Sequence, residues 1–169
     1  MGLVVFSHGR DSSPAARKIT ALLPVARELG WDTLAPDYRE SDDPAVRVEI
    51  LRNSLPAGQR EPLVLYGSSL GGLVSVFAAQ TIPVQGLFLL APAVYWPGYE
   101  HLDYACDVPV IQVVHGWRDE VVGWQQVVRW AGEHHARLEL VDDDHLLSAR
   151  LDELRRTFHH FLQRVADEV

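Results

Sequence analysis

The fold is decided by the segment LVLYGSSLGG, which spans residues 63–72. Residues 63–66 are an uninterrupted apolar run, which is typical of a buried strand. Residues from 70 to about 81 are apolar and small, and they predict a buried helix. Between the two lies the motif G-x-S-x-G, centred on Ser69. The segment therefore predicts a strand, a sharp turn at Ser69 and a helix.

Strand-like and helix-like patterns alternate along the rest of the chain. Strands are expected at about 3–6, 33–35, 63–66, 86–90, 110–114 and 137–141. Helices, with their caps, are expected at about 13–29, 43–55, 70–81, 123–134 and 146–165. This alternation predicts a three-layer α/β/α fold with a six-stranded, mostly parallel sheet. Residues 1–169 are enough for a single domain.

Composition and charge exclude several classes of function. Of the 169 residues, 47% are hydrophobic and 22% are charged, as in an ordinary globular domain. A net charge of −8 argues against nucleic acid as a partner. No apolar run approaches the roughly 20 residues that cross a bilayer, so no membrane association is expected. The N-terminus lacks a basic n-region and Cys106 is the only cysteine, which together favour a cytoplasmic location.

Ser69 has the sequence context of a catalytic nucleophile. The turn is so tight that its flanking residues must be small, and the serine lies where a helix N-terminus stabilises negative charge. Two other interpretations are a plain Gly-Ser turn and a phosphate-binding loop. The phosphate-binding loop requires a lysine where this chain has Leu73. A nucleophile elbow is therefore favoured.

A serine nucleophile needs a base and an acid that orients the base. Asp119 follows the fifth expected strand and His145 follows the sixth, which completes the chain order Ser, Asp, His. Asp119 could instead cap a helix, with Glu120 in its catalytic role, and His145 could cap the last helix. His8 and His115 also follow strands and are weaker candidates for contact with a substrate.

Two backbone N–H groups are candidates for the oxyanion hole. One is that of Leu70, directly after the nucleophile, and the other is that of Arg10, in the loop after the first strand, where Gly9 permits close approach. Arg10 and Arg118 suggest an anionic group on the substrate. No spacing brings three metal ligands together, so no metal and no organic cofactor are expected.

These motifs together resemble the α/β-hydrolase family, in particular its small bacterial members without a lid. The resemblance covers nearly the whole chain and is carried by four stretches: His8-Gly9, the glycines and Ser69 of residues 67–72, residues 115–122 and Asp144-His145. Dienelactone-hydrolase-like enzymes have a close architecture but carry Cys where this chain has Ser69. The resemblance implies Ser69 as nucleophile, His145 as base and Asp119 as its partner.

The chain departs from the family pattern in two places. It begins at the strand that leads to His8, so we expect a minimal core without the two N-terminal strands common in the family. Residues 92–109 leave no room for a helical lid, so we expect an open site. Tyr95, Trp96 and Trp117 would bound it as substrate-binding residues, with packing over the sheet edge as an equal alternative.

The expected function is that of a serine hydrolase that cleaves small carboxylic esters or thioesters through an acyl-serine intermediate. One alternative is a protein-binding module on a hydrolase scaffold, because fold does not fix function. Another is a peptidase or amidase that uses the same triad. A homodimer also stays open.

Overall fold

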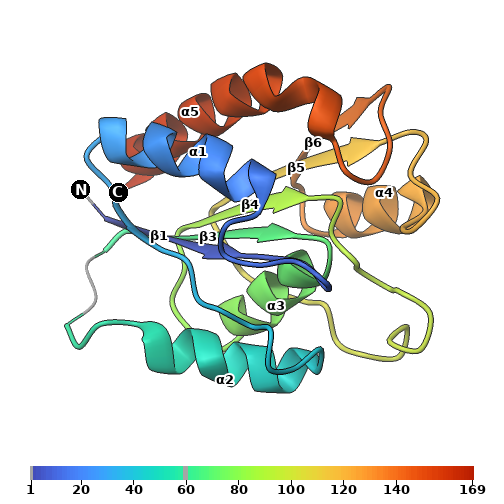
Figure 1. The fold of residues 1–169 in the computed structure, drawn as a ribbon, viewed down its shortest axis with the longest axis horizontal. Coiled ribbons are helices and arrows are strands. Elements are labelled where there is room, and N and C mark those ends of the chain that lie inside the picture. Colours follow the sequence, from blue (N-terminus) through green and yellow to red (C-terminus); the bar gives the residue numbers. More distant parts are fainter. Residues whose placement is uncertain (1, 59–60) are drawn as a thin grey trace.

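The computed structural model describes residues 2–58 and 61–169 and has six parallel strands in one sheet (Figure 1). The strand order is β2-β1-β3-β4-β5-β6, and every neighbouring pair is parallel. The strands are β1 Leu3–Ser7, β2 Asp32–Leu34, β3 Leu63–Ser68, β4 Gly86–Leu90, β5 Val110–Gly116 and β6 Arg137–Val141. The predicted six-stranded parallel sheet is confirmed, and all carboxyl ends of its strands lie along one edge.

Helices cover both faces of the sheet. They are α1 Arg17–Glu28, α2 Pro44–Ser54, α3 Leu70–Ala79, α4 Trp124–Glu133 and α5 Leu151–Glu168, preceded by the short 3₁₀ helix η1 Ser148–Arg150. Helices α1 and α5 pack together on one face, while α2 and α3 pack together on the other (Figure 1). Within the part of the chain that is described, no helix combines the length and the apolar character needed to cross a bilayer.

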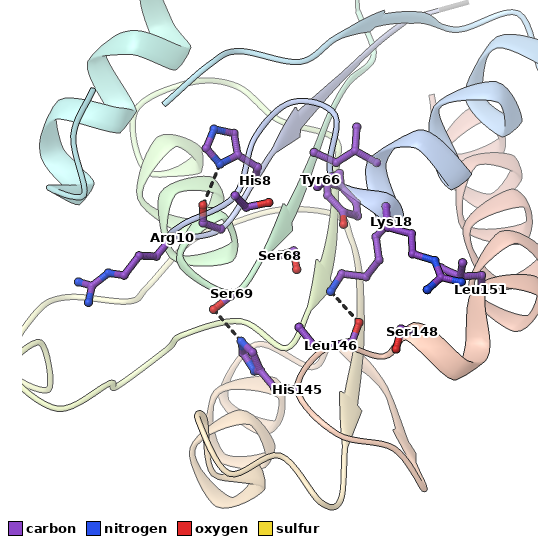
Figure 2. Close-up of a pocket in the computed structure, with 15 residues that line it drawn as sticks. His8, Arg10, Lys18, Tyr66, Ser68, Ser69, His145, Leu146, Ser148 and Leu151 are labelled. Atoms are coloured by element: carbon purple, nitrogen blue, oxygen red, sulfur yellow. Dashed lines mark hydrogen bonds between the residues drawn. The ribbon is translucent and has the colours of Figure 1, made fainter. Parts of the chain in front are cut away.

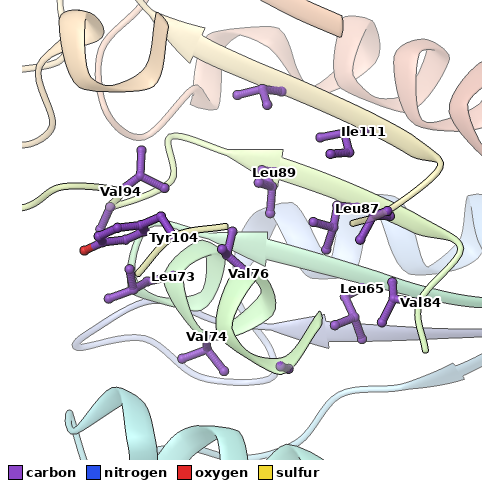
Figure 3. Close-up of a cluster of buried hydrophobic side chains, with 14 of the residues drawn as sticks. Leu65, Leu73, Val74, Val76, Val84, Leu87, Leu89, Val94, Tyr104 and Ile111 are labelled. Carbon is purple, nitrogen blue, oxygen red and sulfur yellow. The ribbon is translucent and has the colours of Figure 1, made fainter. Parts of the chain in front are cut away.

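The buried side chains form one apolar layer on each face of the sheet. Figure 3 shows the layer in which Leu65, Leu87 and Leu89 of the sheet meet Leu73 and Val76 of α3. The layer beneath α1 and α5 is rich in aromatic rings from Phe6, Tyr66, Phe88, Phe158 and Phe161. Strands β1, β3, β4 and β5 are buried on both faces, which explains why their sequences are continuous apolar runs.

The predicted start of the first helix at Ser13 is wrong, because α1 begins at Arg17. Ser13 instead closes a turn: its carbonyl accepts from the N–H of Ala16 and its hydroxyl accepts from the N–H of Ala15. Serine before proline favours a turn as readily as a helix cap. Gly30 ends the helix region as predicted, with φ of +80°.

Two further helix predictions differ from the structure. The last helix begins at Leu151 rather than at 146, because Leu147 is left-handed (φ 53°) and a 3₁₀ turn follows it. In α4, the helical spacing of Trp124, Val127, Val128 and Ala131 predicts one apolar face, but Trp124 and Val128 are 36% and 37% exposed. Trp130 is buried instead, and its indole N–H donates to the carbonyl of Tyr104.

Candidate active site

Ser69 lies at the turn between β3 and α3, in a conformation that the surrounding backbone enforces. Its φ of 54° and ψ of −117° are strained for a residue with a side chain. A Cβ added to Gly67 would lie 2.3 Å from the carbonyl oxygen of Gly71, and one added to Gly71 would lie 2.0 Å from that of Ser7. Because both neighbours are backbone, neither position has room for a side chain. The G-x-S-x-G pattern is therefore a steric requirement of this turn.

The structure brings Ser69, His145 and Asp119 together in one chain of hydrogen bonds. The Ser69 hydroxyl lies 3.0 Å from Nε2 of His145 and donates to it. On the other side of the ring, Nδ1 of His145 donates to Oδ2 of Asp119 at 2.6 Å. These residues follow β3, β6 and β5, three strands whose carboxyl ends lie along the same edge of the sheet. Ser69 and His145 are 76 residues apart in sequence, and Asp119 and His145 are 26 apart; the sheet brings them into contact.

Asp119 is held as a carboxylate although its side chain is fully buried. Its Oδ1 accepts the N–H groups of Val121 and Val122, each at 2.8 Å. Burial alone would raise the pKa of Asp119, but the hydrogen bonds from His145, Val122 and Val121 outweigh it and lower that pKa. Glu120, the alternative carboxylate, is exposed to solvent. The buried acid therefore fixes the orientation of the His145 ring.

His115 lies behind Asp119 and is completely buried. Its Nε2–H donates to the carbonyl of Val122 at 2.9 Å and lies 3.5 Å from Oδ2 of Asp119. Burial lowers the pKa of His115, which therefore stays neutral. The structure thus places it behind the acid, away from the space beside Ser69 that a substrate would enter.

His8 has both ring nitrogens bonded to the backbone. Its Nδ1–H donates to the carbonyl of Gly9 at 2.8 Å, and its Nε2 accepts the N–H of Tyr38 at 3.0 Å. The side chain is 1% exposed, and burial lowers its pKa. His8 therefore braces the loop after β1 as a neutral ring.

The loop after β1 approaches the elbow closely enough to supply an oxyanion donor. A Cβ on Gly9 would lie 3.3 Å from the carbonyl oxygen of Ser68 and 3.4 Å from Cβ of Ser69. Within residues 2–58 and 61–169, the N–H groups of Arg10 and Leu70 have no hydrogen-bond acceptor. These two N–H groups remain the candidates for the oxyanion hole.

Arg47 of α2 holds this loop in place, and no sequence pattern indicates that role. The side chain is 1% exposed. Its Nη1 donates to the carbonyls of His8 (3.1 Å) and Gly9 (3.3 Å), and its Nε donates to that of Ser41 (2.7 Å). In the sequence, Arg47 is one of 14 arginines, and only the packing of α2 reveals its contacts.

The three aromatic residues expected around the site lie in different surroundings. Tyr95 is buried, and its hydroxyl donates to Glu133, so it belongs to the packing of α4. Trp96 is half-buried, and the guanidinium of Arg10 lies 5.2 Å from its ring. Trp117 is 48% exposed and packs edge-on against Trp124. None of the three lines the cavity beside Ser69.

A cavity of about 360 Å³ opens between the nucleophile and the start of α5 (Figure 2). Ser69 and His145 lie at one end, and Lys18 of α1, Tyr66 of β3 and Leu151 of α5 line its other walls. Its volume lies within the range of small-molecule sites. The sequence analysis did not predict Lys18 and Tyr66 as cavity residues, because each lies within a pattern that predicts ordinary packing.

Two further sequence expectations concern charge and metals. Arg118, expected near the substrate, is exposed and donates to Asp142 at 2.8 Å, outside the cavity. Over the residues that the structure describes, no group of three His, Cys, Asp or Glu side chains could hold a metal ion.

Comparison with solved structures identifies the class of protein. A protein from Xanthomonas campestris pv. campestris, described as a candidate hydrolase of the alpha/beta superfamily, is 35% identical, with a TM-score of 0.86 over 97% of this chain and 99% of that one. Est1E from Butyrivibrio proteoclasticus is 18% identical, with a TM-score of 0.81 over 98% and 88%. The esterase Pf2001 of Pyrococcus furiosus is 15% identical, with a TM-score of 0.77 over 96% and 82%. The last two show the fold alone, and the protein is an α/β hydrolase.

The family assignment is narrower. The model of the family described as "Uncharacterised protein family (UPF0227)" matches residues 3–108, from β1 to the segment before β5. This chain belongs to that family. The comparison with curated proteins gave no match.

Proposed function

We propose that this protein is a serine hydrolase that cleaves small carboxylic esters or thioesters through an acyl-serine intermediate. One observation carries the proposal: Ser69, at a strained elbow, is hydrogen-bonded to His145, which is hydrogen-bonded to the buried Asp119. A nucleophile, a base and an orienting acid in this geometry are the parts that acyl transfer requires.

The first half of the reaction acylates Ser69. Nε2 of His145 removes the hydroxyl proton as Oγ attacks the carbonyl carbon of the ester. The N–H groups of Leu70 and Arg10 stabilise the negative charge on the carbonyl oxygen, and each such donor contributes about 3–4 kcal/mol to the transition state. The bond to the leaving group then breaks, and His145 returns the proton to the departing alcohol or thiol. Asp119 stabilises the imidazolium throughout.

The second half releases the acid. Water attacks the acyl carbon while His145 accepts its proton, and the bond to Ser69 Oγ breaks as the proton returns to that oxygen. Two structural neighbours make esters the favoured class. Pf2001 is named an esterase, and Est1E is solved with ferulic acid bound. Residues 92–109 contain no helix that could cover the site, which suits a small soluble substrate.

Labelling with a fluorophosphonate probe, read by intact mass, tests the nucleophile. We expect one adduct on the wild-type protein, one on the Ser54→Ala control, whose serine lies on α2, and none on Ser69→Ala. An adduct on Ser69→Ala, or none on folded wild-type protein, would contradict the proposal and favour the binding-module alternative.

The choice between ester and amide is a second measurement. Turnover of 4-nitrophenyl butyrate and of the 4-nitroanilide of the same acid isolates the bond type, because the acyl group is unchanged. We expect kcat/KM to favour the ester by at least about 100-fold. Comparable values would favour the peptidase or amidase alternative.

A further inference from the structure

The cavity beside Ser69 is positively charged although the protein is acidic. The chain has 23 acidic and 15 basic residues. The residues that line the cavity nevertheless contain no Asp or Glu and include the cations Arg17 and Lys18. Arg10 also lines it, but its guanidinium turns away from the cavity and pairs with Asp42 at 3.6 Å (Figure 2). A cavity lined by one sign of charge attracts ligands of the opposite sign. The difference between the cavity and the rest of the surface therefore points to an anionic ligand.

Lys18 is the cation placed deepest in the cavity wall. It is half-buried, and Nζ donates one hydrogen bond, at 2.8 Å, to the carbonyl of Leu146, the residue after the base (Figure 2). An ammonium group has three donors, so two stay available. Burial lowers the pKa of Lys18, which an anion beside it would oppose.

The carboxylates nearest to Lys18 do not neutralise it directly. Asp119, Asp143 and Asp144 act on it electrostatically, but among the described residues none comes within ion-pair distance of its ammonium. Each has another partner: Asp119 bonds His145, Asp143 bonds the N–H of Asp144, and Asp144 bonds the N–H of Leu146. They keep the ammonium charged without filling its donor sites.

Two hydroxyl groups lie in the same wall. The hydroxyl of Tyr66 is buried and has no hydrogen-bond partner in the described chain. Burial raises the pKa of Tyr66, and the nearby Ser68 side chain opposes this rise. Figure 2 shows the Tyr66 hydroxyl, Ser68 and the Lys18 ammonium directed toward the same space. A buried donor without a partner costs about 1–3 kcal/mol, which an acceptor on a ligand would offset.

The remaining walls limit the shape of the ligand. Ala16, Ile19 and Leu151 supply apolar surface, and the cavity volume is about 360 Å³. A short aliphatic chain fits such walls, and a charged end would fit Lys18 and Tyr66.

We propose that this cavity binds a negatively charged end of the substrate, with Lys18 as the specificity-determining residue. The preferred substrate is then a small ester that carries a carboxylate group as well as the ester bond. This inference rests on the proposed function for the identity of the scissile bond. The anion lies on either the acyl or the alcohol side of the ester, and the test has an arm for each.

Matched pairs of esters test the preference by kcat/KM. The acyl arm compares the mono-4-nitrophenyl ester of adipic acid with 4-nitrophenyl hexanoate, and the alcohol arm compares 3-acetoxybenzoate with phenyl acetate, with uncatalysed rates subtracted. We expect the wild type to prefer the anionic member of at least one pair by about 10-fold or more. Lys18→Met should abolish the preference and Lys18→Arg should retain part of it.

A ratio within one variant removes general effects on activity. Lys18 also bonds the carbonyl next to His145, so Lys18→Met will slow both members of a pair, and only the ratio reports the charge. Arg156→Met, on the exposed surface of α5, changes the net charge equally and should leave the ratio unchanged. Equal kcat/KM within both wild-type pairs, or a preference that survives in Lys18→Met, would overturn the inference.

A binding measurement separates this inference from the proposed reaction. Calorimetric titration of Ser69→Ala with the same esters needs no turnover. Tighter binding of an anionic ester, lost when Lys18→Met is added, supports the cavity even if fluorophosphonate labelling fails. If the anionic and neutral esters bind equally while fluorophosphonate labelling is normal, the anion-binding role of the cavity is wrong and the serine hydrolase proposal stands.

Discussion

The elbow at residues 67–72 and the loop at residues 142–147 present the two reacting side chains, and they do so by different physics. In the elbow, every residue except Ser69 is buried, and added atoms at Gly67 or Gly71 would meet backbone. In the loop, exposed and buried residues alternate, and both side chains and backbone N–H groups supply the hydrogen bonds. The nucleophile is thus held mainly by shape and the base mainly by hydrogen bonds, although Gly116 also packs closely against the backbone of the base loop.

The hydrogen bonds of the loop come from several distant segments. Lys18 of α1 bonds the carbonyl of Leu146, and Arg118 N–H after β5 bonds the carbonyl of Asp143. The most direct contact is that of Asp119 with the His145 ring. Changes in the elbow should therefore appear mainly as lost stability, and changes around the base mainly as lost rate.

The largest effect is expected from Asp119→Asn, on the base side. The amide would donate toward Nδ1 of His145 and favour the wrong tautomer, so kcat should fall about 10³–10⁴-fold. Stability by urea unfolding should change much less than this. Asp142→Asn, an exposed change in the loop, should keep kcat within about twofold. A loss below tenfold in Asp119→Asn would indicate that Glu120 orients the base.

The elbow should respond in the opposite way to Gly71→Ala. The added methyl group meets the carbonyl oxygen of Ser7 at 2.0 Å, so we expect a loss of about 3 kcal/mol or more in the free energy of unfolding. Gly132→Ala in α4 is the matched control, because nothing lies within 4 Å of its added Cβ. It should stabilise the protein by about 0.5–1 kcal/mol. A Gly71→Ala protein as stable as wild type would contradict the idea that close backbone packing positions Ser69.

Arg47→Met tests how the loop that carries the Arg10 N–H, one of the two oxyanion candidates, responds to a lost contact. A loss of stability would resemble the elbow, and a loss of rate would resemble the base loop. Loss of the Arg47 guanidinium removes its hydrogen bond to the His8 carbonyl and one of the two hydrogen bonds to the Gly9 carbonyl, and it loosens the loop that carries Arg10. We expect kcat to fall about 10–100-fold with a smaller change in KM, measured on a neutral 4-nitrophenyl ester. Arg52→Met, exposed on the same helix, is the control. If KM rises while kcat is unchanged, the loop binds substrate instead.

The same contrast explains what the sequence could predict. The elbow was predictable because its constraint is local: the glycines around Ser69 are required by a turn of a few residues. Asp119 and His145 were predictable because strand ends of a parallel sheet share one edge, whatever holds the loops there. In both cases the sequence pattern reflects the physical constraint that positions the residue.

Residues whose role depends on packing between elements were not predictable. Arg47 and Lys18 lie on helices α2 and α1, and which backbone carbonyl each one reaches depends on where the helix packs. Tyr66 looks like any core aromatic residue until the cavity beside it is known. Tyr95 shows the reverse, since an aromatic residue in an irregular segment proved to pack beneath α4. No local pattern records these contacts.

The smallest effect concerns the buried histidines: His8, in the loop beside the elbow, and His115, behind the acid that orients the base. Burial lowers the pKa of both below the ordinary value of 6.5. As pH falls below 6.5, the unfolded chain therefore binds protons before the folded protein does, and stability is lost. We expect each histidine to lower the free energy of unfolding as the pH falls from 7.5 to 5.5. Asp119, whose pKa is lowered, contributes only at more acidic pH, below its ordinary value of 3.8.

Urea unfolding at the two pH values measures this, with the difference between them as the readout. His115→Gln should remove about half of the pH-dependent loss, whatever it does to stability at pH 7.5. His160→Gln, on the exposed surface of α5, should leave the loss unchanged. If His115→Gln retains the full loss, the base side contributes none of it, and His8, beside the elbow, is its source. The elbow side would then account for the pH dependence of stability, as it is expected to account for most of the stability itself.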